Sequence, residues 1–169
     1  RNFQTKVNDG WRERFKRMVS MHVDWWFAYT GLSQRLVAEM GYSQERITNL
    51  ENSIDSRAFS ALCASVTAQE IAEFRAEWNI GEGPMTVFVG SLYEEKRIDF
   101  LIEAGKRLAT VVPGFRLVVV GAGPQRAMVE TVAERESWLL YVGARFGKQK
   151  AICLRSAVLM LNPGLVGLG

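Results

Sequence analysis

The stretch Met85-Thr-Val-Phe-Val-Gly-Ser-Leu-Tyr-Glu-Glu-Lys-Arg-Ile-Asp-Phe-Leu-Ile-Glu-Ala104 indicates the fold class of this chain. It begins with a nearly unbroken apolar run of strand length, and its last part places Ile98, Leu101 and Ile102 on one helical face. A strand without polar alternation is typical of a parallel sheet that helices cover on both faces. The stretch therefore predicts a buried strand at 85–89, a glycine-bearing loop and a helix that crosses back over the sheet.

The same pattern continues toward the C-terminus. Apolar strands are predicted at 115–120, 138–142 and 157–161, with helices at 124–135 and 148–155 between them. Because crossovers between parallel strands are right-handed, this order predicts an α/β fold with a doubly wound, parallel, Rossmann-like sheet. Such sheets usually have five or six strands, so we expect the domain to be incomplete in this chain.

The preceding residues predict shorter elements. We expect a helix over 11–23, a β-like run at 24–30, a helix at 31–40 that ends before Gly41, a short strand at 46–50, and helical structure over 56–83. Thr67 and Glu70 have the spacing of a capping box, which predicts a helix start within the last of these segments.

The helix predicted over residues 11–23 is amphipathic and basic. Trp11, Phe15, Met18 and Val19 share one face, while arginines and a lysine occupy the other. One interpretation is a solvated basic helix packed on a core. The other is a surface that contacts anionic lipid or an acidic partner.

Composition narrows the classes of function. The 169 residues have a net charge of +3, with 48% hydrophobic and 23% charged residues, which is the balance of a globular protein. So small a charge permits an anionic ligand without indicating nucleic acid. Cys63, Cys153 and the single His22 are far apart, so we expect reduced thiols, a cytoplasmic chain and no metal site. No apolar run reaches the roughly 18 residues of a membrane span.

Ligands of open parallel sheets bind at the carboxyl ends of the strands. The corresponding loops are predicted at 90–96, 121–124, 143–147 and 162–169, and each contains glycine, which lets backbone N–H groups approach a phosphate. Lys96 stands between the first strand and its helix, where a cation can neutralise a diphosphate leaving group. The alternative is a solvated lysine at a helix start, although helix starts usually prefer acids.

Other chemistries fit the loops less well. The segment Gly121-Ala-Gly-Pro-Gln-Arg126 fails the dinucleotide-binding pattern, because Arg126 replaces the third glycine and no acid stands at 141–143. No loop ends in the Gly-Lys-Ser/Thr triplet of a P-loop. A single histidine in the N-terminal segment argues against a Ser-His-Asp or Cys-His centre.

Taken together, these motifs resemble a known family. Residues 87–104 resemble the strand, loop and helix that open the C-terminal domain of family 4 retaining glycosyltransferases, which have the B-type fold of two Rossmann-like domains. Similar motifs follow in the family's order at 113–124, 142–143 and 156–163, and residues 29–55 resemble its interdomain segment. The resemblance spans about residues 24–169.

The resemblance implies a division of the chain into three parts. Residues 1–57 would be the end of the acceptor domain with the interdomain segment, residues 58–84 a helical linker, and residues 85–169 a partial nucleotide-sugar-binding domain.

It also implies roles for particular residues. Lys96 would bind the donor diphosphate and act catalytically by stabilising its departure, and Val142 and Gly143 would offer backbone groups to the nucleobase. The family often has arginine at the position of Ser91 and a glutamate at that of Val166, so this chain lacks two family contacts. The full set of implied donor-binding residues is Gly90, Ser91, Lys96, Gly121, Gly123, Val142, Gly143 and Gly167.

We therefore expect part of a metal-independent and cofactor-independent enzyme that transfers a sugar from a nucleoside-diphosphate sugar, with retention, to a glycan or lipid-linked acceptor. Residues 11–23 would place it peripherally at the inner face of a membrane, and no nucleic acid partner is expected. The alternative is a non-catalytic nucleotide-sugar-binding module with a degenerate site.

Overall fold

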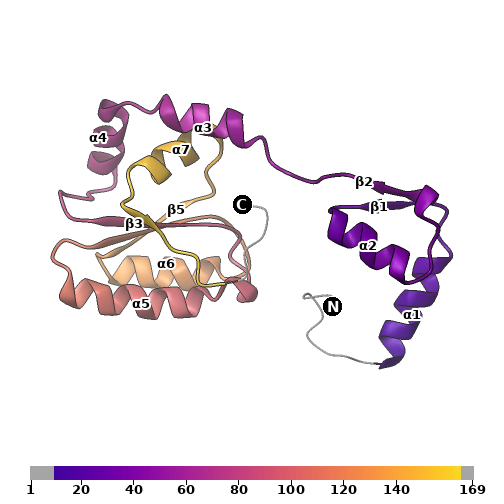
Figure 1. The fold of residues 1–169 in the computed structure, drawn as a ribbon. Helices are drawn as coiled ribbons and strands as arrows, with labels where there is room; N and C mark the ends of the chain where they lie inside the picture. The colour runs from indigo at the N-terminus through magenta and orange to yellow at the C-terminus, as the bar shows by residue number, and fades with distance from the viewer. Residues whose placement is uncertain (1–9, 165–169) are drawn as a thin grey trace. The chain divides into compact units, whose positions relative to one another are not determined.

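The computed structural model describes residues 10–164 and has the expected α/β class (Figure 1). The chain divides between Ile54 and Asp55 into two compact units. Each unit has a hydrophobic core of its own.

The N-terminal unit is a small α/β element. Its parts are α1 (Gly10–Met21), β1 (Trp26–Ala28), α2 (Gly31–Glu39), the 3-10 turn η1 (Gln44–Arg46) and β2 (Ile47–Asn49). The two strands pair in parallel, with Trp26 opposite Ile47. Ala28 and Ile47 pack with Val37 of α2 and with Tyr42, whose hydroxyl donates a 2.7 Å hydrogen bond to the Val23 carbonyl.

Local signals set both ends of α2. The Thr30 hydroxyl caps its start by accepting a hydrogen bond from the Ser33 N–H at 3.2 Å. The helix ends before Gly41, whose φ of +96° lies in the region that favours glycine. The Gly41 N–H bonds the Ala38 carbonyl at 2.9 Å, so the predicted helix stop is confirmed.

The apolar face of α1 is exposed in the described part of the chain. Trp11 is 65% exposed, Phe15 55% and Met18 53%. The helix reaches the core of its unit through Met21 at its last position. Within this unit, therefore, α1 does not pack on a core by its apolar face, which leaves that face available to something else.

The second unit contains a four-stranded sheet and five α-helices within its described residues. The strands are β3 (Met85–Val89), β4 (Arg116–Val120), β5 (Leu139–Gly143) and β6 (Leu159–Met160), in the order β5-β4-β3-β6. All pairs are parallel, as the sequence predicted. The helices are α3 (Ser56–Ala64), α4 (Ala68–Glu77), α5 (Ile98–Val111), α6 (Arg126–Arg135) and α7 (Gly147–Arg155), with the 3-10 turn η2 (Glu94–Lys96) after β3.

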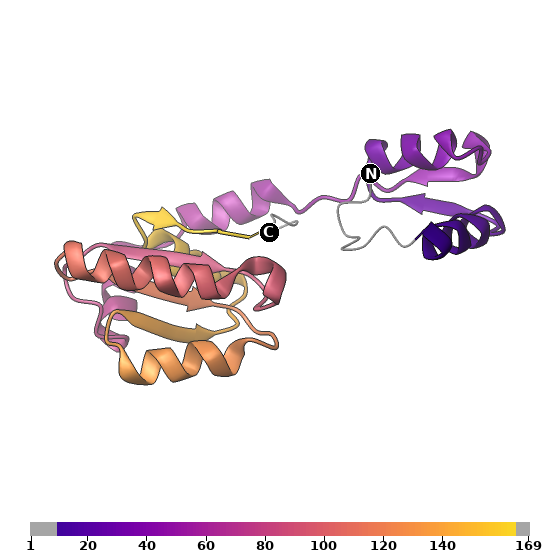
Figure 2. The same ribbon diagram turned by 90° about the horizontal axis from the view of Figure 1, so that it is seen from below.

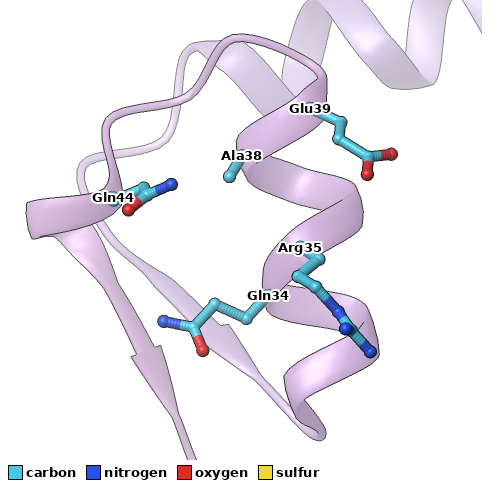
Figure 3. Close-up of a pocket in the computed structure, with 5 residues that line it drawn as sticks. All are labelled: Gln34, Arg35, Ala38, Glu39 and Gln44. Carbon is cyan, nitrogen blue, oxygen red and sulfur yellow. The ribbon is translucent and has the colours of Figure 1, made fainter.

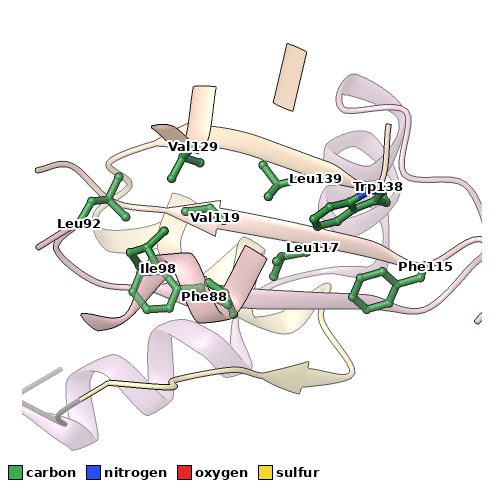
Figure 4. Packing of buried hydrophobic residues seen from close by; sticks show 10 residues of the cluster. Phe88, Leu92, Ile98, Phe115, Leu117, Val119, Val129, Trp138 and Leu139 are labelled. Atoms are coloured by element: carbon green, nitrogen blue, oxygen red, sulfur yellow. The ribbon is translucent and has the colours of Figure 1, made fainter. Parts of the chain in front are cut away.

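Helices cover both faces of this sheet (Figures 1 and 2). α5 and α6 pack on one face, while α7, with α3 and α4 beside it, covers the other. Successive residues of β4 enter the two cores alternately, Leu117 into the first and Val118 into the second. Because both faces of β4 are buried, its residues from Leu117 onward form an unbroken apolar run in the sequence. The first core, shown in Figure 4, gathers Phe88, Leu92, Ile98, Leu101, Phe115, Leu117, Val119, Val129, Trp138 and Leu139.

The helices α3 and α4, which precede β3, belong to the second unit. α4 begins with the predicted capping box: the Glu70 N–H donates to the Thr67 hydroxyl at 3.2 Å, and the Thr67 N–H donates to the Glu70 carboxylate at 2.9 Å. The Arg75 guanidinium donates to the Gly83 carbonyl at 2.7 Å and to the Ser156 carbonyl at 3.4 Å. α4 is thereby tied to the starts of β3 and β6.

Several element boundaries differ from the prediction by a few residues, three of them beside the strand-end loops. α6 begins at Arg126 rather than Pro124, because the Arg126 N–H closes a turn on the Gly123 carbonyl at 3.0 Å. β5 extends to Gly143, whose carbonyl accepts a hydrogen bond from the second strand-end loop. β6 is shorter than predicted because only its residues 159–160 pair with β3.

Candidate functional site

The strand-end loops lie at the carboxyl edge of the parallel sheet. In the loop after β3, the Gly90 N–H donates a 3.0 Å hydrogen bond to the Val120 carbonyl of β4. Ser91 is exposed, and Lys96 is half-buried at the end of η2. The structure therefore places the three first-loop candidates on one short segment between β3 and α5.

Arg97 follows Lys96 in a left-handed conformation, with φ +53° and ψ +49°. This conformation costs a non-glycine residue about 1–2 kcal/mol. Its guanidinium lies 4.7 Å from the ring centroid of Phe100, a cation–π arrangement. Sequence reasoning missed Arg97, because an arginine carries no local signal for a left-handed turn. The turn separates Lys96 from the regular helix.

Gly121 and Gly123 pack against the backbone of the first loop. A Cβ at Gly121 would overlap the carbonyl oxygen of Gly90, and a Cβ at Gly123 would lie 2.7 Å from the backbone nitrogen and oxygen of Leu92. No side chain can be accommodated at either distance. Packing between two loops is thus sufficient to explain both glycines, whereas the sequence suggested only the approach of a phosphate.

Hydrogen bonds join the same two loops. The Leu92 N–H donates to the Ala122 carbonyl, and the Gln125 N–H donates to the Leu92 carbonyl, both at 2.9 Å. The side-chain Oε1 of Gln125 is buried and has no hydrogen-bond partner among the described residues. A buried acceptor beside these loops was not foreseen from the sequence, since it depends on the tertiary packing around it.

The third loop is tied to the second through Gly121. The Gly121 N–H donates to the Gly143 carbonyl at 3.0 Å, and the Tyr141 hydroxyl donates to the Gly121 carbonyl at 2.9 Å. Val142 is buried, with its side chain in the second core. The Val142 side chain and the Gly143 carbonyl are therefore already engaged. Any contact with a nucleobase would use the remaining backbone groups of these two residues.

The fourth loop is described as far as Gly164, which packs against the backbone of Glu95 and Lys96. Val166 and the candidate Gly167 lie outside the described residues. Of the implied donor-binding set, the structure brings seven residues to the ends of three adjoining strands and the loops that follow them, namely Gly90, Ser91, Lys96, Gly121, Gly123, Val142 and Gly143.

Two surface hollows lie away from Gly90 and Lys96. One, of about 500 Å³, lies on α2 and η1 of the N-terminal unit and is lined by Gln34, Arg35, Ala38, Glu39 and Gln44 (Figure 3). The other, of about 270 Å³, lies between α4 and α7 and has Trp78 and Arg145 in its lining. The second hollow reaches the carboxyl edge of the strands only through Arg145, in the loop after β5. The strand-end loops remain the better candidate, because they bring Lys96 to this edge together with three glycine-bearing strand ends.

An ion pair joins α7 to α4. The Lys148 ammonium lies 2.5 Å from the Glu70 carboxylate, and this pair lowers the pKa of Glu70, with hydrogen bonds from Thr67 adding to the effect.

In residues 10–164, no group of three or more His, Cys, Asp or Glu side chains could hold a metal ion. None of the helices described is long and apolar enough to cross a membrane.

Several solved structures share this fold. HepE of Anabaena in complex with UDP-glucose superposes with a TM-score of 0.63 at 16% identity, over 89% of this chain and 41% of that one. A glycosyltransferase from Rickettsia africae gives 0.64 at 12% identity, over 95% and 43%. WaaG, a glycosyltransferase involved in lipopolysaccharide biosynthesis, gives 0.58 at 23% identity, over 82% and 37%. At these identities the likeness shows the fold, and the chain spans about two fifths of the length of these structures.

No curated protein sequence matches the chain. A family model does: the one described as Glycosyl transferases group 1 matches residues 83–168, which is half of the chain and contains the whole strand-end site. The four strands and the glycine-bearing loops described above lie within the matched region. The chain therefore belongs to the glycosyl transferases group 1 family.

Proposed function

We propose that this chain is the donor-binding part of a retaining glycosyltransferase of family 4, and that the loops after β3, β4 and β5 hold a nucleoside-diphosphate sugar. The observation that carries the proposal is the position of Lys96. It lies on a turn between β3 and α5, at the carboxyl edge of a parallel sheet, in a chain of this family. HepE, which shares the fold, is solved in complexes with UDP and with UDP-glucose, and this supports a nucleotide-sugar ligand here.

In the proposed reaction, the bond between the anomeric carbon and the diphosphate oxygen breaks. The Lys96 ammonium stabilises the negative charge that develops on the departing diphosphate. The acceptor hydroxyl then bonds to the anomeric carbon on the face the diphosphate leaves, which retains the configuration, and its proton passes to the departing diphosphate oxygen. We propose no metal or other cofactor for this step. Ser91 takes the position of a second phosphate cation, so Lys96 has a larger share of the charge stabilisation.

The second candidate is a non-catalytic module that binds a nucleotide-sugar without transferring its sugar. Ser91 is the observation that favours it, because an exposed hydroxyl replaces a charge in the phosphate loop. The 169-residue chain by itself is proposed to bind the donor without turning it over. Appreciable donor hydrolysis or sugar transfer by this chain would contradict that part of the proposal.

We further propose a glycan or lipid-linked acceptor, a cytoplasmic setting, and peripheral contact of α1 with an anionic membrane. The exposed Trp11, Phe15 and Met18 support the membrane contact. On the helix, Arg14 lies at the border of this apolar face and Arg17 on the polar side, which is typical of helices that lie in a membrane interface.

The test of the donor site is a calorimetric titration of the chain with UDP, GDP and ADP. We expect one nucleotide to bind, and we expect Lys96→Ala to weaken its affinity about ten- to a hundredfold, the value of one charge-assisted hydrogen bond. Lys106→Ala, which removes an exposed lysine from α5, is the matched control and should leave the affinity unchanged. If Lys96→Ala binds as tightly as the wild type, the phosphate assignment is wrong.

A further inference from the structure

The chain that leaves β6 runs beside the loop that carries Lys96. β6 pairs in parallel with β3, with Thr86 opposite Leu159 and Val87 opposite Met160. The Leu161 N–H donates a 2.8 Å hydrogen bond to the Val87 carbonyl, which extends the pairing past the end of the strand. Since both strands end at the same edge, the residues after β6 emerge next to those after β3.

Gly164 then passes directly over the Lys96 turn. A Cβ placed on Gly164 would overlap the Cα of Lys96, would lie 2.5 Å from the carbonyl oxygen of Glu95, and 2.7 Å from the carbonyl carbon of Lys96. All three are backbone atoms, so no side chain could rotate away to make room. One of the two segments would have to move by about 1 Å to restore van der Waals separation.

Space, rather than conformational freedom, makes glycine necessary at this position. Gly164 is not among the glycines with a left-handed φ, so its backbone conformation is one that other residues adopt. An alanine there would therefore meet one obstacle, the backbone of the Lys96 turn. This distinguishes Gly164 from Gly41, where substitution would also strain the backbone.

We propose that Gly164 is a positioning residue for Lys96: by packing without a side chain on the Glu95–Lys96 backbone, it sets the place of the ammonium group relative to the donor diphosphate. The proposal rests on the function proposed above for Lys96. Its physical content is that the loop after β6 determines the geometry of the loop after β3. A misplacement of about 1 Å is enough to lower the effectiveness of a charged group by as much as a hundredfold.

The contact itself can be measured without any ligand. In the wild-type 169-residue chain, we expect a nuclear Overhauser effect between the α protons of Gly164 and Lys96. In Gly164→Ala, we expect amide chemical shifts to change at residues 93–97 as well as at 162, 164 and 165, because the Lys96 and Arg97 N–H groups are bonded within the η2 turn to Tyr93 and Glu94. Gly31→Ala is the control, since its Cβ would meet nothing closer than the Asn49 amide nitrogen at 3.9 Å.

The functional consequence is read with two probes, UDP and uridine. We expect Gly164→Ala to bind UDP about tenfold more weakly and to bind uridine as the wild type does, because Lys96 is proposed to contact the diphosphate alone. A general loss of folding would weaken both ligands, lower the melting temperature and shift resonances throughout the unit.

The outcomes separate the two proposals. If the nuclear Overhauser effect is absent, or if shifts in Gly164→Ala are confined to residues 162, 164 and 165, the positioning role is wrong. If shifts reach Lys96 but UDP affinity is unchanged relative to Gly31→Ala, the loop moves without consequence and the role is also wrong. If the wild type binds neither UDP nor any other nucleoside diphosphate while the shifts do reach Lys96, the donor-binding function fails and the loop-to-loop contact stands.

Discussion

The Tyr141 hydroxyl donates a 2.9 Å hydrogen bond to the carbonyl oxygen of Gly121, and this bond joins β5 to the loop after β4. Tyr141→Phe would remove it while keeping the ring, over which the Arg126 guanidinium lies at 5.9 Å. We expect a loss of about 1 kcal/mol in the free energy of unfolding, measured by urea denaturation. Tyr93→Phe, at a residue 53% exposed, should change it little. Equal effects of the two variants would show that the bond contributes nothing.

Gly105 is where α5 approaches the first core most closely. A Cβ there would lie 2.6 Å from the Trp138 ring and 3.1 Å from Leu117. Gly105→Ala should therefore lower the free energy of unfolding, because overpacking costs about 1–3 kcal/mol and alanine gains only about 1 kcal/mol over glycine in a helix. Thermal unfolding checks this, with Gly31→Ala for comparison. A Gly105→Ala protein as stable as the wild type would mean that α5 can shift to accept a methyl group.

The pair of Glu70 and Lys148 predicts a dependence of stability on pH. The lowered pKa of Glu70 means that the pair stabilises the folded state above the unfolded value near 4.5 and that this contribution is lost as pH falls through the lower, folded-state pKa. Glu70→Gln should accordingly be less stable than the wild type in urea at pH 7, with the difference disappearing near pH 3. Glu73→Gln, at a residue bonded to Gln69, is the control. A difference that persists at pH 3 would assign the effect to the capping box instead.

The two cysteines are free and should differ in reactivity. Cys153 is 1% exposed and its burial raises the pKa of the thiol, whereas Cys63 is partly exposed. Because the thiolate is the reactive form, we expect iodoacetamide at pH 8 to modify Cys63 about tenfold faster or more. Peptide mass spectrometry over a time course measures the two rates. Similar rates would indicate frequent opening of the core around α7.

The proposed membrane contact of α1 has an electrostatic part and an apolar part, which can be tested separately. We expect the chain to float with vesicles of anionic phosphatidylglycerol, and less so at high salt, since screening weakens the attraction of Arg14 and Arg17. Arg14→Glu should remove binding at low salt, and Phe15→Ser should remove it at all salt concentrations. Phe146→Ser, at a residue 78% exposed in the other unit, is the matched control. If flotation does not depend on anionic lipid, the proposal of an anionic membrane contact is wrong. We would then expect the apolar face of α1 to pack on another protein surface.

Local sequence signals fixed the elements of this chain and their order. The apolar run of β4 follows from the two cores that it enters on alternate residues, and the start of α4 follows from the Thr67–Glu70 capping box. Gly41 marks the end of α2 because only a residue tolerant of positive φ fits there. Such signals lie within a few neighbouring residues, which is why the α/β class and the parallel sheet could be predicted.

The candidate site was only partly predictable. Sequence pointed to the glycine loops and to Lys96, but the reason for the glycines is that Gly121, Gly123 and Gly164 each pass against the backbone of the loop after β3. The left-handed Arg97 was likewise invisible in the pattern, and the pattern left open whether the apolar face of α1 packs on a core or is exposed. Which backbone lies against which is decided by the order of strands in the sheet, through contacts between residues up to about 70 positions apart. The sequence by itself thus determined where the strand-end loops lie along the chain, and the tertiary structure decided which backbone segments pack against the turn that carries Lys96.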